Sequence, residues 1–378
     1  MRLTSPLISV AVPVPFLDAL TYSVPAACAL PPVGARVRVP VGTRTATGCV
    51  VDHNSGAAPD TEIKALVDVV DEEPFLPPSI VGLCQWMAEY YVAGIGDAIG
   101  VAMPPGARVR ATGFRTRRVA ALTAHGLSWQ PGGEVAVTVA QATALKALAD
   151  APVGLPVADL RDRGVTAAVL ARLAARGFVH FREETAERDP FAHAAMPAAV
   201  PAADRALTGE QAAALGQLSV LADAGSFRVA LLHGVTGSGK TEIYLRLADR
   251  VWQSGRQVLL MVPEIALTPS VASLFRGLFG TRLAIQHSAL SDGERHDQWH
   301  RIRRGDVDLV IGTRSAVFAP LTRLGLIIVD EEHDSSYKQE GDPRYEARHV
   351  AGRRAAEEDA VLLAGTATPR PEAWHGLE

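Results

Sequence analysis

The chain has 378 residues and a formal net charge of −4; 48% of the residues are hydrophobic and 21% are charged. This composition excludes an intrinsically disordered chain, and the length predicts two or three domains. No run of about 18 uninterrupted apolar residues occurs, and prolines interrupt the apolar N-terminus, so we expect neither a membrane-spanning helix nor a secretory signal. Three widely spaced cysteines predict a reducing compartment, and they cannot form a four-cysteine zinc site.

The first 107 residues are predicted to form a β-rich module. Alternating apolar residues favour strands over 8–12, 36–39 and 48–51, with glycines and prolines between them. An apolar stripe at helical spacing then predicts one helix over 78–92 that closes the module.

The middle of the chain, residues 116–185, is predicted to be a small separate domain. Its apolar pattern predicts three helices and then a strand, which is the order of a winged-helix domain: 138–148, 156–163, 165–176 and 177–182. An Ala/Pro-rich stretch over 188–206 follows and is typical of a linker.

From residue 207 to the end, short apolar runs alternate with helical segments. The runs predict strands of a parallel sheet that is covered on both faces: 229–232, 257–262, 309–311, 326–329 and 361–364. We therefore expect an α/β domain over 207–378.

A glycine-rich loop in this domain matches the pattern GxxxxGK[ST], and it lies between a predicted strand and a predicted helix. Backbone N–H groups in such a loop converge on phosphate oxygens, and the helix N-terminus adds partial positive charge. Lys240 would reach the β- and γ-phosphates, and the Thr241 hydroxyl would bind Mg²⁺. The full set of predicted ATP contacts in the loop is Gly234, Val235, Thr236, Gly237, Ser238, Gly239, Lys240 and Thr241.

A second motif, Asp330-Glu331-Glu332-His333, follows the buried run 326–329. Ligands of open α/β sheets bind at the carboxyl ends of the strands, where these acids are expected. Asp330 would hold Mg²⁺ through water, and Glu331 would orient or deprotonate the attacking water. His333 could couple the γ-phosphate to nucleic acid or simply form a local hydrogen bond.

These motifs resemble those of superfamily 2 helicases of the DExH type. Gln211 lies upstream of the glycine-rich loop, like the glutamine by which helicases read adenine. The other similar segments are 262–269 (motif Ia), 312–316 (motif Ib) and 365–369 (motif III, here Gly-Thr-Ala-Thr where Ser-Ala-Thr is usual).

Two further regions narrow the resemblance to the primosomal protein N′ (PriA) family. Residues 336–348 resemble its aromatic-rich loop, and 11–15, 34–42 and 64–69 resemble its domain for the 3′ end of DNA. The resemblance implies a RecA-like lobe, a 3′-DNA-end-binding domain and a winged helix. It also implies recognition of stalled or branched forks, primosome assembly and ATP- and Mg²⁺-dependent 3′–5′ helicase activity in the cytoplasm, at the nucleoid. The implied partners are forked and single-stranded DNA, single-strand-binding protein and helicase-loading proteins, with no membrane.

Candidate DNA contacts combine this resemblance with residue chemistry, since aromatic rings stack on bases and cations pair with phosphates. They are Tyr22, Arg36, Lys64, Tyr337, Lys338, Arg344 and Tyr345. The family pocket for the 3′ end often has an aromatic-acid-tyrosine triplet. Here the triplet is Leu20-Thr21-Tyr22, so only Tyr22 remains aromatic. Alternatively, 336–348 is a solvated loop with two anchoring tyrosines, and Arg36 and Arg38 form a solvated strand face.

The similarity ends just after motif III. The family's second RecA-like lobe, its zinc module and its C-terminal domain are therefore expected to be absent from this sequence, although zinc is expected in the full-length family. Because the resemblance places the arginine finger in the second lobe, we expect ATP binding with poor turnover. The alternative is a fork-binding scaffold for primosome loading that is not a motor. A metabolic P-loop ATPase would leave the N-terminal resemblance unexplained.

Overall fold

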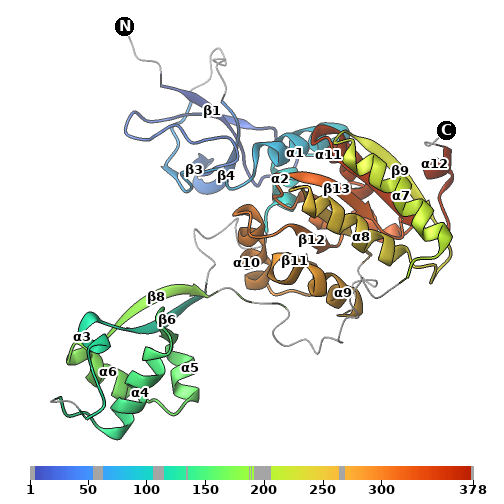
Figure 1. The fold of residues 1–378 in the computed structure, drawn as a ribbon. Helices are drawn as coiled ribbons and strands as arrows, with labels where there is room; N and C mark the ends of the chain where they lie inside the picture. The colour runs from blue at the N-terminus through green and yellow to red at the C-terminus, as the bar shows by residue number, and fades with distance from the viewer. Residues whose placement is uncertain are drawn as a thin grey trace. The chain divides into compact units, whose positions relative to one another are not determined.

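The structure is a computed structural model that describes residues 5–53, 63–104, 115–132, 135–186, 188, 190, 206–263 and 269–375. It contains two compact units, one formed by 1–113 with 189–378 and the other by 114–188 (Figure 1). Among the described residues, no helix combines the length and the apolar character needed to cross a bilayer.

The N-terminal part of the first unit is a five-stranded antiparallel sheet in the order β2-β1-β4-β3-β5. Its strands are β1 (Leu7–Ala11), β2 (Leu20–Ser23), β3 (Arg36–Val41), β4 (Arg44–Asp52) and β5 (Asp68–Val69). Alternate residues such as Ile8, Val10, Val37 and Val39 pack in one apolar core. The predicted β-rich module is confirmed, and β2 is a strand that the apolar pattern did not predict.

Arg36 lies inside this module and not on a solvated face. Its guanidinium pairs with Asp71 through Nε (2.7 Å) and Nη2 (2.9 Å) and lies 4.2 Å from the centre of the Phe75 ring. Only 4% of the residue is exposed, while Arg38, two positions along β3, is exposed. Burial and the bidentate ion pair leave Arg36 no access to a DNA phosphate, so its prediction as a DNA contact is wrong.

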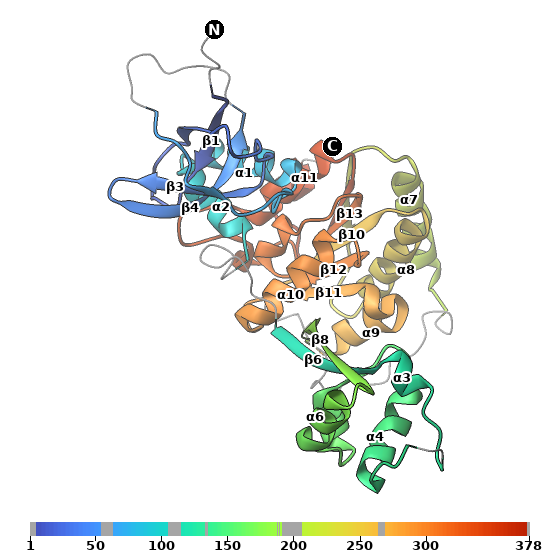
Figure 2. The same ribbon diagram turned by 90° about the vertical axis from the view of Figure 1, so that its left-hand side faces the viewer.

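Two helices follow the β module: α1 (Pro78–Tyr90) and α2 (Ile95–Ala102). Their apolar residues share one core cluster with residues of the α/β domain, and Figure 2 shows α1 beside α11 (Ala347–Glu357). Helix α1 was predicted to close the β module. In the structure it packs on the α/β domain as well. Helix α2 was not predicted, because two glycines lower its helix propensity. Gly96 is needed there, since a Cβ would overlap the main-chain oxygen of Val12.

The α/β domain is built on a six-stranded sheet in the order β11-β12-β10-β13-β14-β9, and every pair is parallel. Its strands are β9 (Arg228–His233), β10 (Gln257–Met261), β11 (Leu283–Gln286), β12 (Leu309–Gly312), β13 (Leu324–Val329) and β14 (Val361–Thr366). The predicted parallel sheet is confirmed, with β11 as the strand that the sequence pattern missed.

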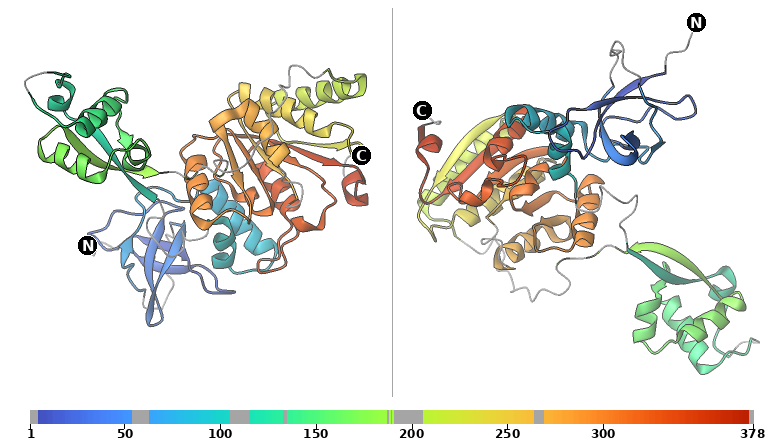
Figure 3. Two further views of the ribbon diagram at one scale, coloured as in Figure 1. Left: turned by 90° about the horizontal axis from the view of Figure 1, so that it is seen from below. Right: turned by 180° about the vertical axis from the view of Figure 1, so that it is seen from behind.

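Helices cover both faces of this sheet, as the continuous apolar runs predicted (Figure 3). One face packs against α7 (Gly209–Asp223), α8 (Lys240–Gln253) and α9 (Pro269–Phe279). The other packs against α10 (Asp292–Arg303), α11, α1 and α2 and the 3₁₀ turns η4 (Arg314–Phe318) and η5 (Ser335–Tyr337). Alternate strand residues divide between the faces: Val258 and Leu260 join the first core, and Leu259 and Met261 the second. The remaining elements are η3 (Gly280–Arg282) and α12 (Pro371–His375).

The second unit combines helices with a three-stranded antiparallel sheet in the order β7-β6-β8. Its elements are β6 (Arg115–Leu122), α3 (Ala124–Leu127), α4 (Val139–Ala149), β7 (Leu155–Pro156), α5 (Val157–Asp162), α6 (Ala167–Ala175) and β8 (Val179–Ala186). Helices occur at the three predicted places and a strand follows them, while the winged-helix assignment stays a prediction. The predicted linker over 188–206 lies almost entirely outside the described residues.

Two arginines on β3 provide a matched test of this packing. Arg36→Ala leaves the Asp71 carboxylate without its partner and is expected to lower the free energy of unfolding by about 2–4 kcal/mol. Arg38→Ala removes an exposed side chain and is expected to change it by about 0.5 kcal/mol or less. Urea unfolding of both variants measures the difference, and equal effects would contradict the buried ion pair.

Candidate functional site

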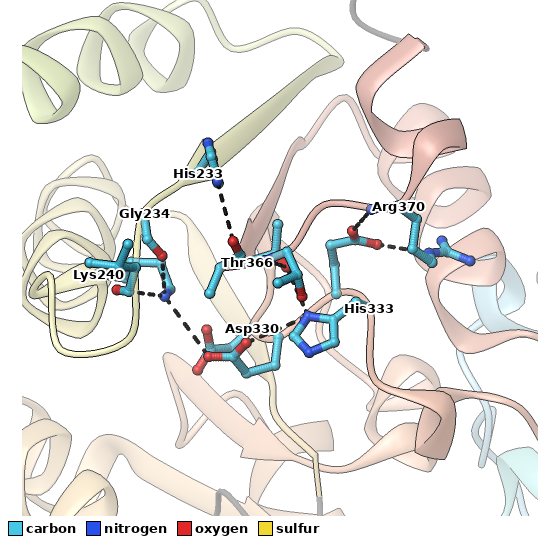
Figure 4. Close-up of polar contacts among 12 residues, drawn as sticks. His233, Gly234, Lys240, Asp330, His333, Thr366 and Arg370 are labelled. Atoms are coloured by element: carbon cyan, nitrogen blue, oxygen red, sulfur yellow. Dashed lines mark hydrogen bonds and ion pairs between the residues drawn. The ribbon is translucent and has the colours of Figure 1, made fainter.

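Three motifs meet at the carboxyl edge of the parallel sheet. The loop 234–241 leaves β9, the acidic motif 330–333 leaves β13, and 367–369 leaves β14, which lies between the other two strands. The register pairs Thr366 with His233 and Ala364 with Val329, so β9 and β14 end together and β13 ends two residues earlier at the same edge. Figure 4 shows the resulting group of polar side chains.

The predicted phosphate-binding loop has the backbone that its glycines predict. Gly237 (φ 79°) and Gly239 (φ 83°) lie in the left-handed region, which a residue with a Cβ rarely adopts. Lys240 begins α8 and donates from Nζ to the main-chain oxygen of Gly234 (2.9 Å). Thr241 follows it in the first helical turn. The other residues predicted as ATP contacts lie along the loop between these points: Val235, Thr236 and Ser238.

Gln211 lies against this loop. It is the third residue of α7, where its side chain accepts from the N–H of Thr208 and completes a capping box. Its amide also donates to the main-chain oxygen of Ser238 (2.8 Å). The glutamine predicted to read adenine is thus fixed beside the loop by hydrogen bonds at both ends of its amide.

The acidic motif faces Lys240. Oε1 of Glu331 lies 3.9 Å from the Lys240 ammonium, and Glu331 itself has a positive φ of 45°. Such a conformation is unusual for a residue with a side chain and costs on the order of 1 kcal/mol. Oδ1 of Asp330 accepts a hydrogen bond from Tyr244 (2.9 Å). Burial raises the pKa of Asp330 above its ordinary value, although the Tyr244 hydrogen bond and the Lys240 charge oppose that rise.

The last two residues of the acidic motif contact the end of β14. Nδ1 of His333 lies 2.8 Å from the Thr366 hydroxyl, which also accepts from the N–H of Thr368. The buried Glu332 carboxylate accepts from the main-chain N–H and from Nε of Arg370, each at 3.0 Å. His333 therefore has the local hydrogen bond that was one of its two predicted roles.

Motif Ib lies beside the segment that resembles the aromatic-rich loop. Arg314 donates from Nη1 to the main-chain oxygens of Ser336 (3.2 Å) and Lys338 (2.8 Å), which holds the two segments together. Most of the motif Ia segment, residues 264–268, lies outside the described residues.

The two tyrosines of the aromatic-rich segment are core residues. Tyr337 is 0% exposed and Tyr345 is 1% exposed. The Tyr337 hydroxyl lies 2.7 Å from the main-chain oxygen of Asp330 and 3.1 Å from that of Met261. Burial raises the pKa of both tyrosines. A ring enclosed in this way has no free face for a base, so the stacking prediction for Tyr337 and Tyr345 is wrong and the anchoring alternative is correct.

The cations of the same segment remain accessible. Lys338 is exposed; its ammonium donates to the main-chain oxygen of Arg344 (2.6 Å) and lies 5.4 Å from the centre of the Tyr91 ring. The Arg344 side chain is 74% exposed, and its Nε lies 3.8 Å from Asp342. Both residues can reach a phosphate from these positions.

In the N-terminal module the two remaining candidates differ. Tyr22 is buried in the sheet, donates to the main-chain oxygen of Pro40 (3.0 Å) and has a pKa raised by burial. It cannot stack on a base, so its prediction as a stacking residue is wrong. Lys64 is exposed, and its main-chain oxygen accepts from the N–H of Ser23 at the end of β2.

Several residues of the site were missed by sequence reasoning. Tyr244 binds Asp330, and Arg370 binds Glu332. Thr366 and Arg348 lie in segments that the sequence did single out, motif III and 336–348, but their contacts with His333 and with the main-chain oxygen of Glu332 were not predicted. One sequence signal existed: Tyr244 lies four residues after Lys240, on the same helical face. Among the described residues, no group of three or more His, Cys, Asp or Glu is arranged to hold a metal ion.

The raised pKa of Asp330 predicts a pH-dependent stability. A carboxyl whose folded pKa exceeds its unfolded pKa binds more protons in the native state, so its contribution to stability is lost as pH rises through the folded pKa. Asp330→Asn removes this titration and is expected to raise the Tm of the ligand-free protein more at pH 8 than at pH 4. Thermal unfolding at the two pH values tests this, and an equal or smaller gain at pH 8 would contradict it.

Comparisons with known families match two parts of the chain. The PriA family of the 3′DNA-binding domain (3′BD) matches residues 9–104, and the family of DEAD/DEAH box helicases matches residues 211–374. A helicase domain of this kind implies the use of ATP and Mg²⁺.

Curated relatives agree with both matches. The replication restart protein PriA of Haemophilus influenzae is 36% identical over 375 residues, which cover 98% of this chain and 50% of the relative. The Bacillus subtilis protein of the same name is 41% identical over 254 residues, 66% of this chain and 30% of the relative. That of Synechocystis is 55% identical over 146 residues, 38% of this chain and 18% of the relative. The chain thus spans half or less of the length of these relatives.

Among solved structures, one similar chain is RecG bound to a three-way DNA junction, with a TM-score of 0.36 and 24% identity over 46% of this chain and 23% of that one. Another is the Sulfolobus solfataricus SWI2/SNF2 ATPase core in complex with dsDNA, with a TM-score of 0.32 and 18% identity over 44% and 32%. The two family matches and the curated relatives confirm the resemblance found in the sequence. The chain belongs to the family of the replication restart protein PriA and carries a 3′ DNA-binding domain and a helicase domain of that family.

Proposed function

We propose that the carboxyl edge of the parallel sheet is a Mg²⁺–ATP site. The observation that carries the proposal is the approach of Lys240 to Glu331, which joins two motifs about 90 residues apart at the end of one sheet. In this proposal the backbone of 234–239 and the Lys240 ammonium bind the phosphates, which replace the main-chain oxygens that Lys240 now contacts. Gln211 reads the adenine from its position beside the loop.

The donors present fit a magnesium ion. Mg²⁺ prefers oxygen ligands, keeps several waters and is usually held by one or two protein groups with substrate phosphates, so no cluster of protein ligands is required. Thr241 at the start of α8 and the partly buried carboxylate of Asp330 would hold it. Bound there, the ion would neutralise charge on the phosphates. Glu331, paired loosely with Lys240, orients or deprotonates the attacking water.

A second function, binding of the 3′ end of DNA, is supported by the family match over 9–104. After the burial of Arg36 and Tyr22 is taken into account, Lys64 is the remaining candidate cation in this module. In the helicase domain, Lys338 and Arg344 are the remaining candidates, on a segment whose tyrosines are anchored in the core. These contacts would bind the phosphate backbone without reading sequence.

Together the two functions support replication restart: recognition of stalled or branched forks, the start of primosome assembly and ATP-dependent 3′–5′ helicase activity. Single-strand-binding protein and helicase-loading proteins are the partners that family membership suggests. The described residues supply one RecA-like lobe, and the arginine that the family resemblance places in a second lobe would complete hydrolysis. We therefore expect this chain to bind Mg²⁺–ATP and to hydrolyse it slowly.

Lys240→Ala tests the nucleotide site. The variant lacks the ammonium that is proposed to bind phosphate. Because hydrogen bonds to charged groups contribute about 1.5–3 kcal/mol, we expect Mg²⁺–ATP binding to weaken at least about tenfold. Isothermal titration calorimetry measures the affinity, and circular dichroism checks that the variant is folded. Unchanged affinity in a folded variant would overturn the proposed site. Fork binding that survives in this variant would separate DNA recognition from nucleotide binding, as the scaffold alternative requires.

Lys64→Ala tests the DNA contact. We expect binding of a fork with a free 3′ end to weaken about 3- to 10-fold, which corresponds to about 0.7–1.4 kcal/mol for one phosphate contact. Lys146→Ala removes an exposed lysine of the second unit and serves as the matched control. Fluorescence anisotropy with forks that carry a free or a blocked 3′ end measures the preference. A Lys64→Ala variant that keeps the full affinity for the free end would contradict the assignment.

A further inference from the structure

Tyr244 lies where the three motifs of the site meet. It is on α8 four residues after Lys240, and it is 1% exposed. Its ring packs in the apolar core on the α8 face of the sheet, while its hydroxyl points to the carboxyl edge and donates to Oδ1 of Asp330 at 2.9 Å. Tyr244 belongs to none of the family motifs named above, yet it contacts a residue of the acidic motif.

The hydrogen bond has a fixed direction. The Tyr244 hydroxyl donates and Oδ1 of Asp330 accepts, because a phenol carries its proton at neutral pH and a carboxylate has only acceptor oxygens. A buried hydroxyl without a partner is costly, and so is a buried carboxylate. The pair satisfies both groups and engages one of the two carboxylate oxygens of Asp330.

Gly365 in motif III provides the space for this hydroxyl. A Cβ on residue 365 would overlap the Tyr244 oxygen and would lie 2.8 Å from Cζ of its ring. Gly365 is a strand residue of β14 outside the set of positive-φ glycines, so its backbone conformation does not require glycine. Its carbonyl accepts from the N–H of Glu332 (3.0 Å), which fixes its distance from the acidic motif. The space taken by Tyr244 therefore explains the glycine at position 365, directly before the Thr-Ala-Thr of residues 366–368 that corresponds to the usual Ser-Ala-Thr.

From these contacts we propose that Tyr244 is the positioning residue for Asp330 and that Gly365 is the small residue that admits it. The inference rests on the Mg²⁺–ATP site proposed above. The Asp330 carboxylate can rotate about its side-chain bonds. A hydrogen bond that already holds it in one orientation reduces the conformational entropy that the side chain loses when the ion binds. Holding Oδ1 leaves the second oxygen available to the hydration shell of Mg²⁺. Tyr244 thus serves metal binding without touching the nucleotide.

Tyr244→Phe keeps the ring and removes only the hydroxyl. For the full 378-residue chain, we expect the Mg²⁺ concentration for half-maximal binding of a fluorescent ATP analogue to rise about 3- to 10-fold. Binding of the same analogue in EDTA should change less than about twofold, since the hydroxyl that is removed donates to Asp330 and not to the phosphate-binding loop. Tyr345→Phe removes another buried hydroxyl outside this site and is the matched control; its Mg²⁺ dependence should equal that of the parent.

Gly365→Ala tests the same pair from the other side. The methyl group displaces the phenol from Asp330, so this variant should also raise the Mg²⁺ requirement and lower the Tm. Adding Tyr244→Phe should recover part of the lost Tm, because the overlapping oxygen is gone while Cζ remains close. If Tyr244→Phe fails to fold, Gly365→Ala still tests the proposal.

The proposal is overturned if folded Tyr244→Phe, or Gly365→Ala in its place, keeps the parent's Mg²⁺ requirement. It is also overturned if binding weakens equally with and without Mg²⁺, since that pattern indicates a purely structural role. Failure of the underlying site has a different signature: Lys240→Ala would then bind the nucleotide as tightly as the parent.

Discussion

The parallel alignment of β9, β14 and β13 is the constraint on which the site depends. Parallel strands end at one edge of the sheet, and the register pairs Thr366 with His233 and Ala364 with Val329. The glycine-rich loop, motif III and the acidic motif therefore begin side by side, although they are far apart in the sequence. The buried side chains that hold this edge together, Tyr244 and Glu332, each contact more than one of the three motifs or their flanking residues. A shift of one strand would separate Lys240 from Glu331 and remove the phosphate and metal positions together.

The same unit also includes the DNA-binding module. Helices α1 and α2 contribute to the core beneath the sheet face that carries η4 and α11, and not only to the β module that precedes them. At the end of α1, the Tyr91 hydroxyl accepts from the N–H of Glu346, whose carboxylate pairs with Arg348, and Arg348 contacts Glu332 of the acidic motif. A continuous set of polar contacts thus joins the N-terminal part of the chain to the helicase motif, so the two proposed binding functions share one structural base.

Much of this fold could be predicted because buried strands and helices need apolar residues at regular spacing in the sequence. Continuous apolar runs identified five of the six parallel strands, and the glycine-rich pattern identified a loop whose left-handed residues are glycines. Sequence reasoning missed β11, a four-residue strand at the edge of the sheet whose apolar run includes an alanine and ends in Gln286. It missed α2, where Gly96 allows close packing against Val12. It was wrong about Arg36, Tyr22, Tyr337 and Tyr345 for one physical reason. Residue type predicts what a side chain can bind, but tertiary packing decides whether that side chain faces solvent. These four side chains are buried against other parts of the protein. Tyr244 was overlooked because its partners come from β13 and β14.

The most direct test of the account is a crystal structure of this chain with Mg²⁺ and a non-hydrolysable ATP analogue. The account predicts that the triphosphate lies on 234–241, that Lys240 exchanges its contact with the Gly234 oxygen for phosphate, and that Thr241 and Asp330 flank the metal while Tyr244 keeps its hydrogen bond to Asp330. A nucleotide bound elsewhere, or a metal that has no contact with Asp330 directly or through water, would contradict it.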